Sequence, residues 1–282
     1  MHVGGAERAE DVHGLWDALS DFDASQSEDA AHRLLASLAE RGGMWNATWA
    51  GAIRMSGEDG GGAVEAGADD PLLGWRVAQV KALHPVAPQA ETAPADRGGS
   101  DDCHFREILR VWDRREIDPS FLLPMRGVGT FRTYSLRREL PASWFEGAFY
   151  AEHYASVGTH DAVFVAFPLN QDCESHFGFY SRGPIADGTI AELAYALRGI
   201  KWFHRQLMLA HGLMLASSPL TPTEQRVLHL LLTDASEKQI AHQLGLAEST
   251  THQYVVAIFR KFGVRSRPAL MSLWLSPASQ VR

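Results

Sequence analysis

The sequence has little cysteine and no long apolar run, and each absence excludes a class of protein. Only two cysteines, Cys103 and Cys173, occur among 282 residues, so neither a disulfide framework nor a cysteine-rich zinc site is expected. The nearest approach to a membrane segment, Leu207–Ala216, is interrupted by His211 and is shorter than the ~20 residues that cross a bilayer. The N-terminus also lacks a basic and then apolar leader. We therefore expect a cytoplasmic protein without membrane contact.

Sequence motifs of common catalytic and nucleotide-binding sites are missing as well. The chain has no G-x-S-x-G nucleophile elbow, no G-x-x-x-x-G-K-[ST] phosphate loop, no H-E-x-x-H zinc motif and no G-x-G-x-x-G. The histidines His153, His160 and His176 do not have the spacing of metal ligands. We predict that the chain is not an enzyme and that it needs no metal or cofactor.

The charge that is present is unevenly distributed. The net charge is −8, yet the segment from Pro219 onward has seven basic and four acidic residues, which gives +3 for this segment and −11 for the residues before it. A basic module attached to an acidic remainder is one arrangement of a selective nucleic-acid-binding protein.

The first 216 residues alternate between helical and extended patterns. Helices are predicted at 11–22, 27–41, 103–116, 142–157 and 187–213, and strands at 44–55, 75–83, 128–136, 160–170 and 174–182. This order predicts an α+β fold in which helices cover one face of an antiparallel sheet. Two stretches rich in Gly, Ala, Pro and Asp, 56–70 and 85–102, are predicted to be surface loops.

Residues 220–276 have the start and stop signals of four helices. Thr221-Pro222-Thr223-Glu224 is a capping box with proline at the first helical position. Ser236 and Gln239 form a second capping box, and Gly245 ends the short helix that follows. Two short helices joined at a glycine predict a helix-turn-helix within an all-α domain.

This segment closely resembles the LuxR/FixJ-type helix-turn-helix transcription regulators. The residues that carry the resemblance are Leu220, Thr221, Pro222, Glu224, Lys238, Ile240, Ala241, Thr250, Ile258, Arg260, Lys261, Gly263, Val264, Ser266 and Arg267. The resemblance implies that residues 219–282 bind double-stranded DNA at a pseudo-palindromic operator as a homodimer. RNA polymerase is a further partner that such a regulator would have.

By the same resemblance, the third helix lies in the major groove. The residues expected at DNA are Lys238, Thr250, Thr251, His252, Gln253, Val256, Ala257, Arg260 and Lys261. The Gln253 amide suits adenine, and Val256 or Ala257 suits the methyl group of thymine. His252 stands where the family usually has lysine, and Ala247 stands where it often has a serine cap. We therefore expect weaker DNA binding than is typical of the family.

The element order of residues 1–216 resembles a GAF or PAS-like sensor domain, which implies regulation by an unidentified signal, a small-molecule ligand among the candidates. The predicted helix 187–213 has an apolar stripe at coiled-coil spacing. Two interpretations stay open for its residues Leu197, Ile200 and His204: a dimer seam, or a helix buried in its own domain. Leu270, Leu273 and Trp274 of the fourth C-terminal helix are a second predicted dimer contact, implied by the resemblance.

Two functions therefore follow from the sequence. The first is a sequence-specific DNA-binding transcription regulator with an N-terminal regulatory domain. The alternative is a protein-interaction scaffold whose C-terminal helical bundle docks a partner protein instead of DNA. Seven of the eight tryptophans precede residue 219, which is typical of a protein core and also of a ligand pocket, and the core interpretation is the more common one.

Overall fold

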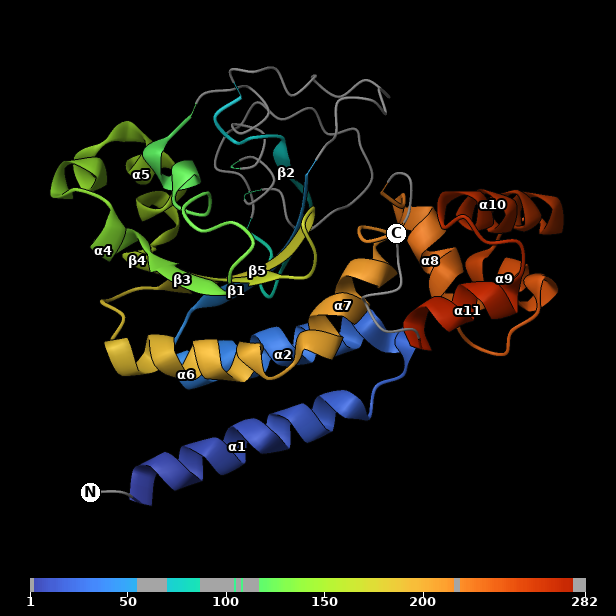
Figure 1. Ribbon diagram of the computed structural model, residues 1–282, viewed down its shortest axis with the longest axis horizontal. Coiled ribbons are helices and arrows are strands. Elements are labelled where there is room, and N and C mark those ends of the chain that lie inside the picture. Colours follow the sequence, from blue (N-terminus) through green and yellow to red (C-terminus); the bar gives the residue numbers. More distant parts are fainter. Residues whose placement is uncertain are drawn as a thin grey trace. The chain divides into compact units, whose positions relative to one another are not determined.

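The computed structural model describes residues 3–54, 70–86, 104, 108, 117–215 and 219–275. The chain divides into two compact units. One, the sheet unit, is Leu35–Arg198; the other, the helical unit, combines Met1–Leu34 with Gly199–Arg282. Each is described by itself, and their elements are labelled in Figure 1. The functional division into residues 1–216 and 219–282 stays a prediction.

The sheet unit is built on five antiparallel strands in the order β2-β1-β5-β4-β3. The strands are β1 (Asn46–Arg54), β2 (Trp75–Ala82), β3 (Arg132–Ser135), β4 (Asp161–Pro168) and β5 (Cys173–Ser181). The β4–β5 hairpin and β1 are buried along most of their length, which requires cover on both faces of the sheet. The predicted α+β fold is confirmed.

Helices lie on both faces of this sheet, whereas the sequence predicted one covered face. The helix α6 (Asp187–Arg198) packs against β4 on one face, and α5 (Ala148–His153) lies on the other (Figure 1). The prediction of one helix over 142–157 is wrong. Gly147 adopts an extended conformation, so the segment consists of the 3-10 helix η3 (Ala142–Glu146), α5 and the 3-10 helix η4 (Ala155–Val157). Two further short helices, α4 (Leu136–Glu139) and the 3-10 helix η2 (Pro119–Leu122), belong to this unit.

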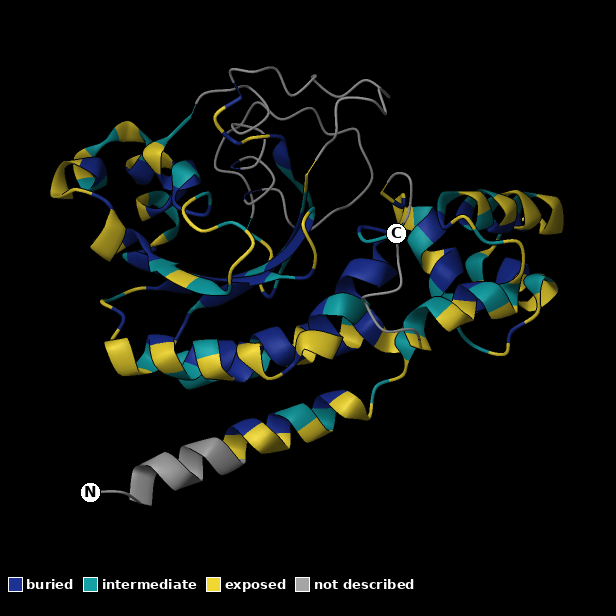
Figure 2. Ribbon diagram, in the orientation of Figure 1, coloured by how far each residue is buried: buried dark blue, intermediate teal, exposed yellow. Residues whose placement is uncertain are grey.

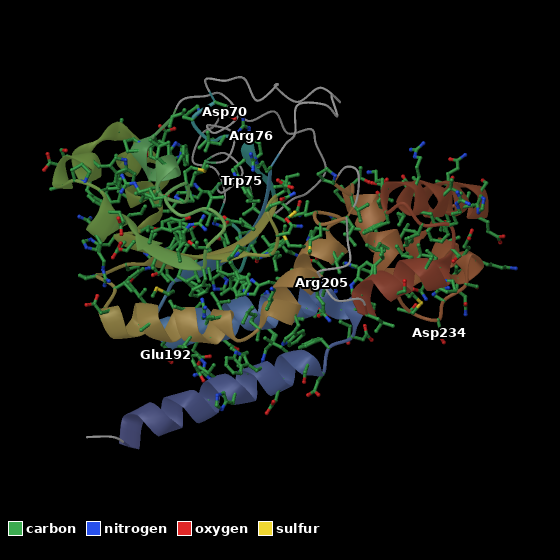
Figure 3. The ribbon with its side chains drawn as sticks, viewed as in Figure 1. Asp70, Trp75, Arg76, Glu192, Arg205 and Asp234 are labelled. Carbon is green, nitrogen blue, oxygen red and sulfur yellow. The ribbon has the colours of Figure 1, made fainter. Side chains whose placement is uncertain are left out.

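Asp70 organises the turn that leads into β2. Its carboxylate accepts hydrogen bonds from the backbone N–H groups of Leu72, at 3.1 Å, and Gly74, at 2.9 Å. It also forms an ion pair with Arg76 at 2.9 Å (Figure 3). Burial by itself raises the pKa of Asp70, but these hydrogen bonds and the charge of Arg76 outweigh it and lower the pKa. The turn therefore depends on an ionised side chain.

The helical unit contains α1 (Val3–Ser20), the 3-10 helix η1 (Ala24–Gln26), the first part of α2 (Ser27–Gly42) and α7 (Lys201–Ala210). Its C-terminal helices are α8 (Pro222–Leu231), α9 (Glu237–Leu244), α10 (Glu248–Lys261) and α11 (Arg267–Leu275). The prediction of one continuous helix over 187–213 is wrong, because α6 ends before Gly199 and α7 begins after Ile200. A Cβ atom at Gly199 would overlap the ring of Trp16. The break therefore allows a close approach that a side chain at this position would prevent.

The predicted dimer seam on this segment is not available at the surface. Leu197, Ile200 and His204 are each 0% exposed within the single chain. A second copy cannot contact these three side chains while the chain keeps this structure, so they do not form a dimer seam in it.

Some predictions fall outside the described residues. The predicted loops 56–70 and 85–102 and the predicted helix 103–116 lie there for most of their length. Cys103 does so too, whereas Cys173 is a buried thiol whose pKa is raised to about 11 by burial. Among the described helices, none has the length and apolar character to cross a membrane.

Candidate nucleic-acid interface

The helix α8 (Pro222–Leu231) begins with the predicted capping box. The Thr221 N–H donates to Glu224 Oε2 at 2.7 Å, and the Glu224 N–H donates to Thr221 Oγ1 at 3.3 Å. Pro222 occupies the first turn, where its missing N–H has no helical partner to lose. Val227, Leu228 and Leu231 point inward and are no more than 1% exposed. This side of α8 is the centre of the domain core.

The helix α9 (Glu237–Leu244) has the second capping box and ends at the turn toward α10. Ser236 accepts from the Gln239 N–H, and the Gln239 side chain accepts from the Ser236 N–H at 2.8 Å. Gly245 ends α9 with φ 66°, a left-handed conformation that other residues resist. The predicted helix-turn-helix is thereby formed.

The helix α10 (Glu248–Lys261) has one buried and one exposed side. Thr251, Val255 and Ile258 are at most 2% exposed and follow the i, i+4, i+7 spacing of one helical face. His252, Gln253, Val256 and Arg260 point away from the core and are exposed. Figure 2 shows this exposed side along α10. We call these four residues the α10 outer face.

The N-terminus of α10 lacks a side-chain cap, as the sequence predicted. Ala247 has the extended backbone conformation of a cap residue, φ −69° and ψ 146°, but no side-chain acceptor. The first N–H groups of α10 are therefore left without a side-chain partner from this position.

The helix α11 (Arg267–Leu275) closes the bundle. Ser266 Oγ accepts from the Ala269 N–H at 3.3 Å. The Arg267 guanidinium donates to the backbone oxygens of Leu231 and Ala235, at 2.7 and 2.6 Å, and to that of Thr233. One side chain thus joins the start of α11 to the α8–α9 connection.

An arginine also joins α7 to α11 within the helical unit. Arg205 of α7 donates to the backbone oxygens of Leu273, at 2.6 Å, and Trp274, at 3.3 Å (Figure 3). Carbonyl groups in the last turn of a helix have no partner within the helix. Arg205 therefore satisfies the C-terminal end of α11.

Most of the residues predicted to contact DNA reach the surface of this domain. Lys238 on α9 and the α10 outer face are exposed, and Thr250 and Ala257 are half-buried beside them. Thr251 is a correction. It is 0% exposed, and its Oγ1 has no hydrogen-bond partner among the described residues, so it cannot touch a ligand at the surface. Its spacing from Val255 and Ile258 was the available signal for burial.

Lys261 has a different role from the predicted DNA contact. Its Nζ lies 2.7 Å from Glu224 Oε2 and donates to the Pro219 backbone oxygen at 3.0 Å. Burial by itself raises the pKa of Glu224, but hydrogen bonds from Lys261 and Thr221 and the charge of Lys261 lower it. Lys261 therefore joins the end of α10 to the start of α8.

The sequence did not reveal an acidic neighbour of the α10 outer face. His252 Nδ1 lies 3.0 Å from Glu237 Oε2, and both side chains are accessible to solvent. A contact between residues 15 positions apart has no local sequence signal. Glu237 offsets positive charge at this surface.

The three residues of α11 that were predicted to contact a second copy differ in their exposure to solvent. Leu270 is 0% exposed and belongs to the domain core, so it is not available to a second copy. Leu273 and Trp274 are half-buried against that core. Met271 and Leu275, which the sequence analysis did not name, are 39% and 87% exposed.

Within the described ranges, no three or more His, Cys, Asp or Glu side chains lie together in a group that could hold a metal ion. The α10 outer face offers amide, imidazole and guanidinium groups for hydrogen bonding on one side of a helix.

Comparisons with solved structures give many weak matches. Twenty-four chains match. The VqsR LBD domain from Pseudomonas aeruginosa is 11% identical, with 71% of this chain and 96% of that chain covered and a TM-score of 0.43. SdiA in complex with octanoyl-rac-glycerol is 11% identical, with coverages of 95% and 93% and a TM-score of 0.44. SdiA from Escherichia coli is 10% identical, with coverages of 96% and 98% and a TM-score of 0.44.

Such low similarity assigns no function to the residues before the C-terminal domain. No curated protein sequence matches the chain. A family model does match, over residues 218–274, and it is that of bacterial regulatory proteins, luxR family. The match covers α8, α9, α10 with its whole outer face, and α11 except its last residue. Residues 218–274 therefore form a domain of the luxR family of bacterial regulatory proteins.

Proposed function

We propose that the chain is a sequence-specific DNA-binding transcription regulator whose remaining residues control its luxR-family domain. The observation that carries this proposal is the α10 outer face. It presents an amide, an imidazole, a guanidinium and an apolar side chain, Val256 at 51% exposure, on the exposed side of a helix with a firmly packed opposite side. A helix of this kind fits the width of the major groove.

The side chains divide into two roles in this proposal. Gln253 would form paired hydrogen bonds with an adenine, and Val256 would contact a thymine methyl group. Arg260 and Lys238 would bind phosphate oxygens and fix the orientation of α10. Lys261 contributes indirectly, because its ion pair with Glu224 supports the position of α10 on α8.

The regulator would act as a homodimer in the cytoplasm. Met271 and Leu275 are exposed apolar residues of α11, and with the half-buried Leu273 and Trp274 they form the surface that we propose for contact between two copies. Two copies related by a twofold axis would read a pseudo-palindromic operator. RNA polymerase is the partner through which such a complex would change transcription.

A gel shift with the DNA upstream of the chain's own gene tests the proposal. Full-length protein is expected to retain this duplex in the presence of excess random duplex, and to lose it as salt rises. Gln253→Ala is expected to weaken specific binding by roughly 5- to 150-fold, the value of one bidentate base contact. Gln243→Ala is the matched control, because Gln243 is exposed on α9 outside the α10 outer face.

Two results would contradict the proposal. Equal affinity for the upstream duplex and the random duplex would remove sequence specificity. Unchanged affinity of the Gln253→Ala variant would show that the α10 outer face does not read DNA, and the domain would then be a protein-docking bundle.

A further inference from the structure

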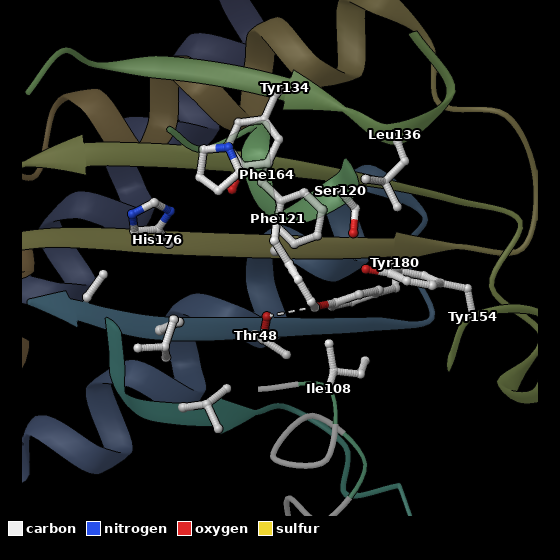
Figure 4. A pocket seen from close by; sticks show the side chains of 16 residues that line it. Thr48, Ile108, Ser120, Phe121, Tyr134, Leu136, Tyr154, Phe164, His176 and Tyr180 are labelled. Atoms are coloured by element: carbon white, nitrogen blue, oxygen red, sulfur yellow. Dashed lines mark hydrogen bonds between the residues drawn. The ribbon is translucent and has the colours of Figure 1, made fainter. Parts of the chain in front are cut away.

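The sheet unit contains a cavity of about 120 Å³ on the sheet face that η2 covers. All five strands contribute residues to its lining, and η2 and neighbouring segments contribute the opposite wall (Figure 4). An apolar protein cavity of about 150 Å³ is large enough to hold benzene. This cavity is somewhat smaller, so its size corresponds to no more than one six-membered ring.

Aromatic side chains form much of the lining. They are Phe121, Tyr134, Tyr154, Phe164 and Tyr180. The rings of Tyr134 and Phe164 are stacked with centroids 5.1 Å apart, and those of Phe164 and Tyr180 meet edge to face at 6.1 Å. These are favourable geometries for adding another planar ring.

Gly178 makes room for this arrangement on β5. A Cβ atom at position 178 would lie 2.9 Å from Phe164 Cε1 and 2.8 Å from Thr48 Oγ1. The absence of a side chain therefore lets Phe164 and Thr48 extend over the strand and shape the floor of the cavity.

The lining excludes a charged ligand. Among the described residues that line the cavity there is no Asp, Glu, Lys or Arg, and His176 already faces Glu174 Oε2 at 3.1 Å. Burial raises the pKa of Tyr180 to about 12 and raises that of Tyr154 well above its ordinary value. A neighbourhood that opposes ionisation of a phenol also opposes the burial of an ionic ligand.

One polar group in the lining lacks a partner. Ser120 is 6% exposed, and its Oγ has no hydrogen-bond partner among the described residues. The hydroxyls of Thr48 and Tyr180, by contrast, bond to each other at 3.3 Å. Buried hydroxyls are normally paired, because an unpaired one has lost its bonds to water without replacement. Ser120 therefore offers one unused hydrogen-bonding position in an otherwise apolar space.

We propose that this cavity binds a compact, uncharged aromatic molecule with one hydroxyl or carbonyl group, which hydrogen-bonds to Ser120 Oγ. The ring would pack among the aromatic side chains, and the single polar group would satisfy the serine. Control of DNA binding by this ligand rests on the proposed function, whereas binding of the ligand itself does not.

Calorimetry on the full-length chain tests the site with three probes of nearly equal size. Phenol has the ring and the hydroxyl, toluene has the ring alone, and benzoate adds a charge. Phenol is expected to bind most tightly, toluene more weakly, and benzoate not at all. Ser120→Ala is expected to weaken phenol binding at least fivefold and to leave toluene binding unchanged.

A cavity-filling substitution gives a second readout. Ala50→Leu on β1 places a larger side chain in the lining and is expected to abolish binding of both phenol and toluene. Ala191→Leu, at an exposed position of α6, is the matched control and is expected to bind both probes normally. Ser120→Ala adds no volume to the core, so the comparison of phenol with toluene in this variant still tests the site if Ala50→Leu fails to fold.

Two results would overturn the inference: no phenol binding by the folded chain, or equal loss of phenol and toluene affinity in Ser120→Ala. The calorimetry is done without DNA, so its result tests the ligand site separately from the proposed function. If the chain binds phenol but no duplex, the ligand site stands and the regulator assignment is wrong. If it binds a duplex but no phenol, the regulator assignment stands and the ligand site is wrong.

Discussion

Glu174 connects β5 to β3 and the turn before it, although its side chain is only 1% exposed. Arg132 of β3 forms two hydrogen bonds with it at 2.9 and 2.8 Å. The Gly129 N–H donates to it at 2.8 Å, and His176 Nε2 lies at 3.1 Å. Burial by itself raises the pKa of Glu174, but the hydrogen bonds from His176, Arg132 and Gly129 outweigh it and lower the pKa from 4.5 to about 2.

This shift predicts a stability that depends on pH in the acid range. A carboxyl group whose pKa is lower in the folded state stabilises the fold fully above the unfolded pKa. That contribution is lost as the pH falls from about 4.5 toward 2. The maximum effect of the shift is about 3 kcal/mol. Urea denaturation at pH 6 and pH 3 is therefore expected to show a large loss of unfolding free energy in the natural protein.

The Glu174→Gln variant isolates this effect. It is expected to be less stable than the natural protein at pH 6, by about 3–5 kcal/mol, because Arg132 is left buried without its partner. Its loss of stability between pH 6 and pH 3 is expected to be smaller. An equal acid-induced loss in both proteins would contradict the role assigned to Glu174.

Two lysines of the luxR-family domain provide a second contrast between residues. Lys238 is exposed, whereas Lys261 forms an ion pair with the buried Glu224. Lys238→Ala is expected to leave stability unchanged and to lower the slope of log affinity against log salt by about 1. Lys261→Ala is expected to reduce the free energy of unfolding by about 1–3 kcal/mol.

The two measurements are urea denaturation of both variants and a salt titration of DNA affinity. The reversed pattern, in which Lys238→Ala destabilises the fold and Lys261→Ala alone changes the salt slope, would contradict this assignment.

Single residues are where prediction from sequence was least complete. Gln253 and Val256 could be placed at the surface because helical spacing fixes the side on which they lie. The pairing of Lys261 with Glu224 connects positions 37 apart, and no local pattern indicates such a pair. The Ser120 hydroxyl, which has no partner among the residues that the structure describes, could not be found either, because only the packing around a hydroxyl decides whether it has a partner.

At the scale of the helix, capping is the feature that decides how firmly α10 begins. Ala247 has cap geometry without a cap side chain. Ala247→Ser is expected to raise the free energy of unfolding by about 1 kcal/mol, because a serine oxygen would accept a hydrogen bond from the first turn of α10. Urea denaturation measures the change.

Ser236→Ala is the reciprocal experiment, because Ser236 already caps α9. It is expected to lower stability by about 1 kcal/mol. A stabilising effect of Ser236→Ala, or no gain from Ala247→Ser, would mean that side-chain caps do not limit the stability of these helices.

Elements were predictable from sequence where their signals are local. The capping boxes at Thr221 and Ser236 and the glycine at 245 mark their helices within a few residues, and the structure confirms all three. The break between α6 and α7 depends instead on the contact of Gly199 with Trp16, which are distant in sequence. A stripe of apolar residues continues across the break, so periodicity alone predicted one helix.

At the scale of the whole molecule, charge is segregated along the chain. The residues from Pro219 onward have a net charge of +3 and the rest have −11. An acidic remainder repels the phosphate backbone and so reduces non-specific affinity, while the contacts of the α10 outer face with base edges are short-range. The sequence specificity of DNA binding is therefore expected to depend on α10 more strongly than the total DNA affinity does.

Nuclear magnetic resonance of the glutamine side-chain amides in the full-length protein tests this claim most directly. On titration with the duplex retained in the gel shift, the Gln253 side-chain amide signals are expected to move or broaden strongly, and those of Gln243 to stay in place. A titration in which Gln253 is unaffected while the duplex is bound would contradict the claim that α10 reads DNA.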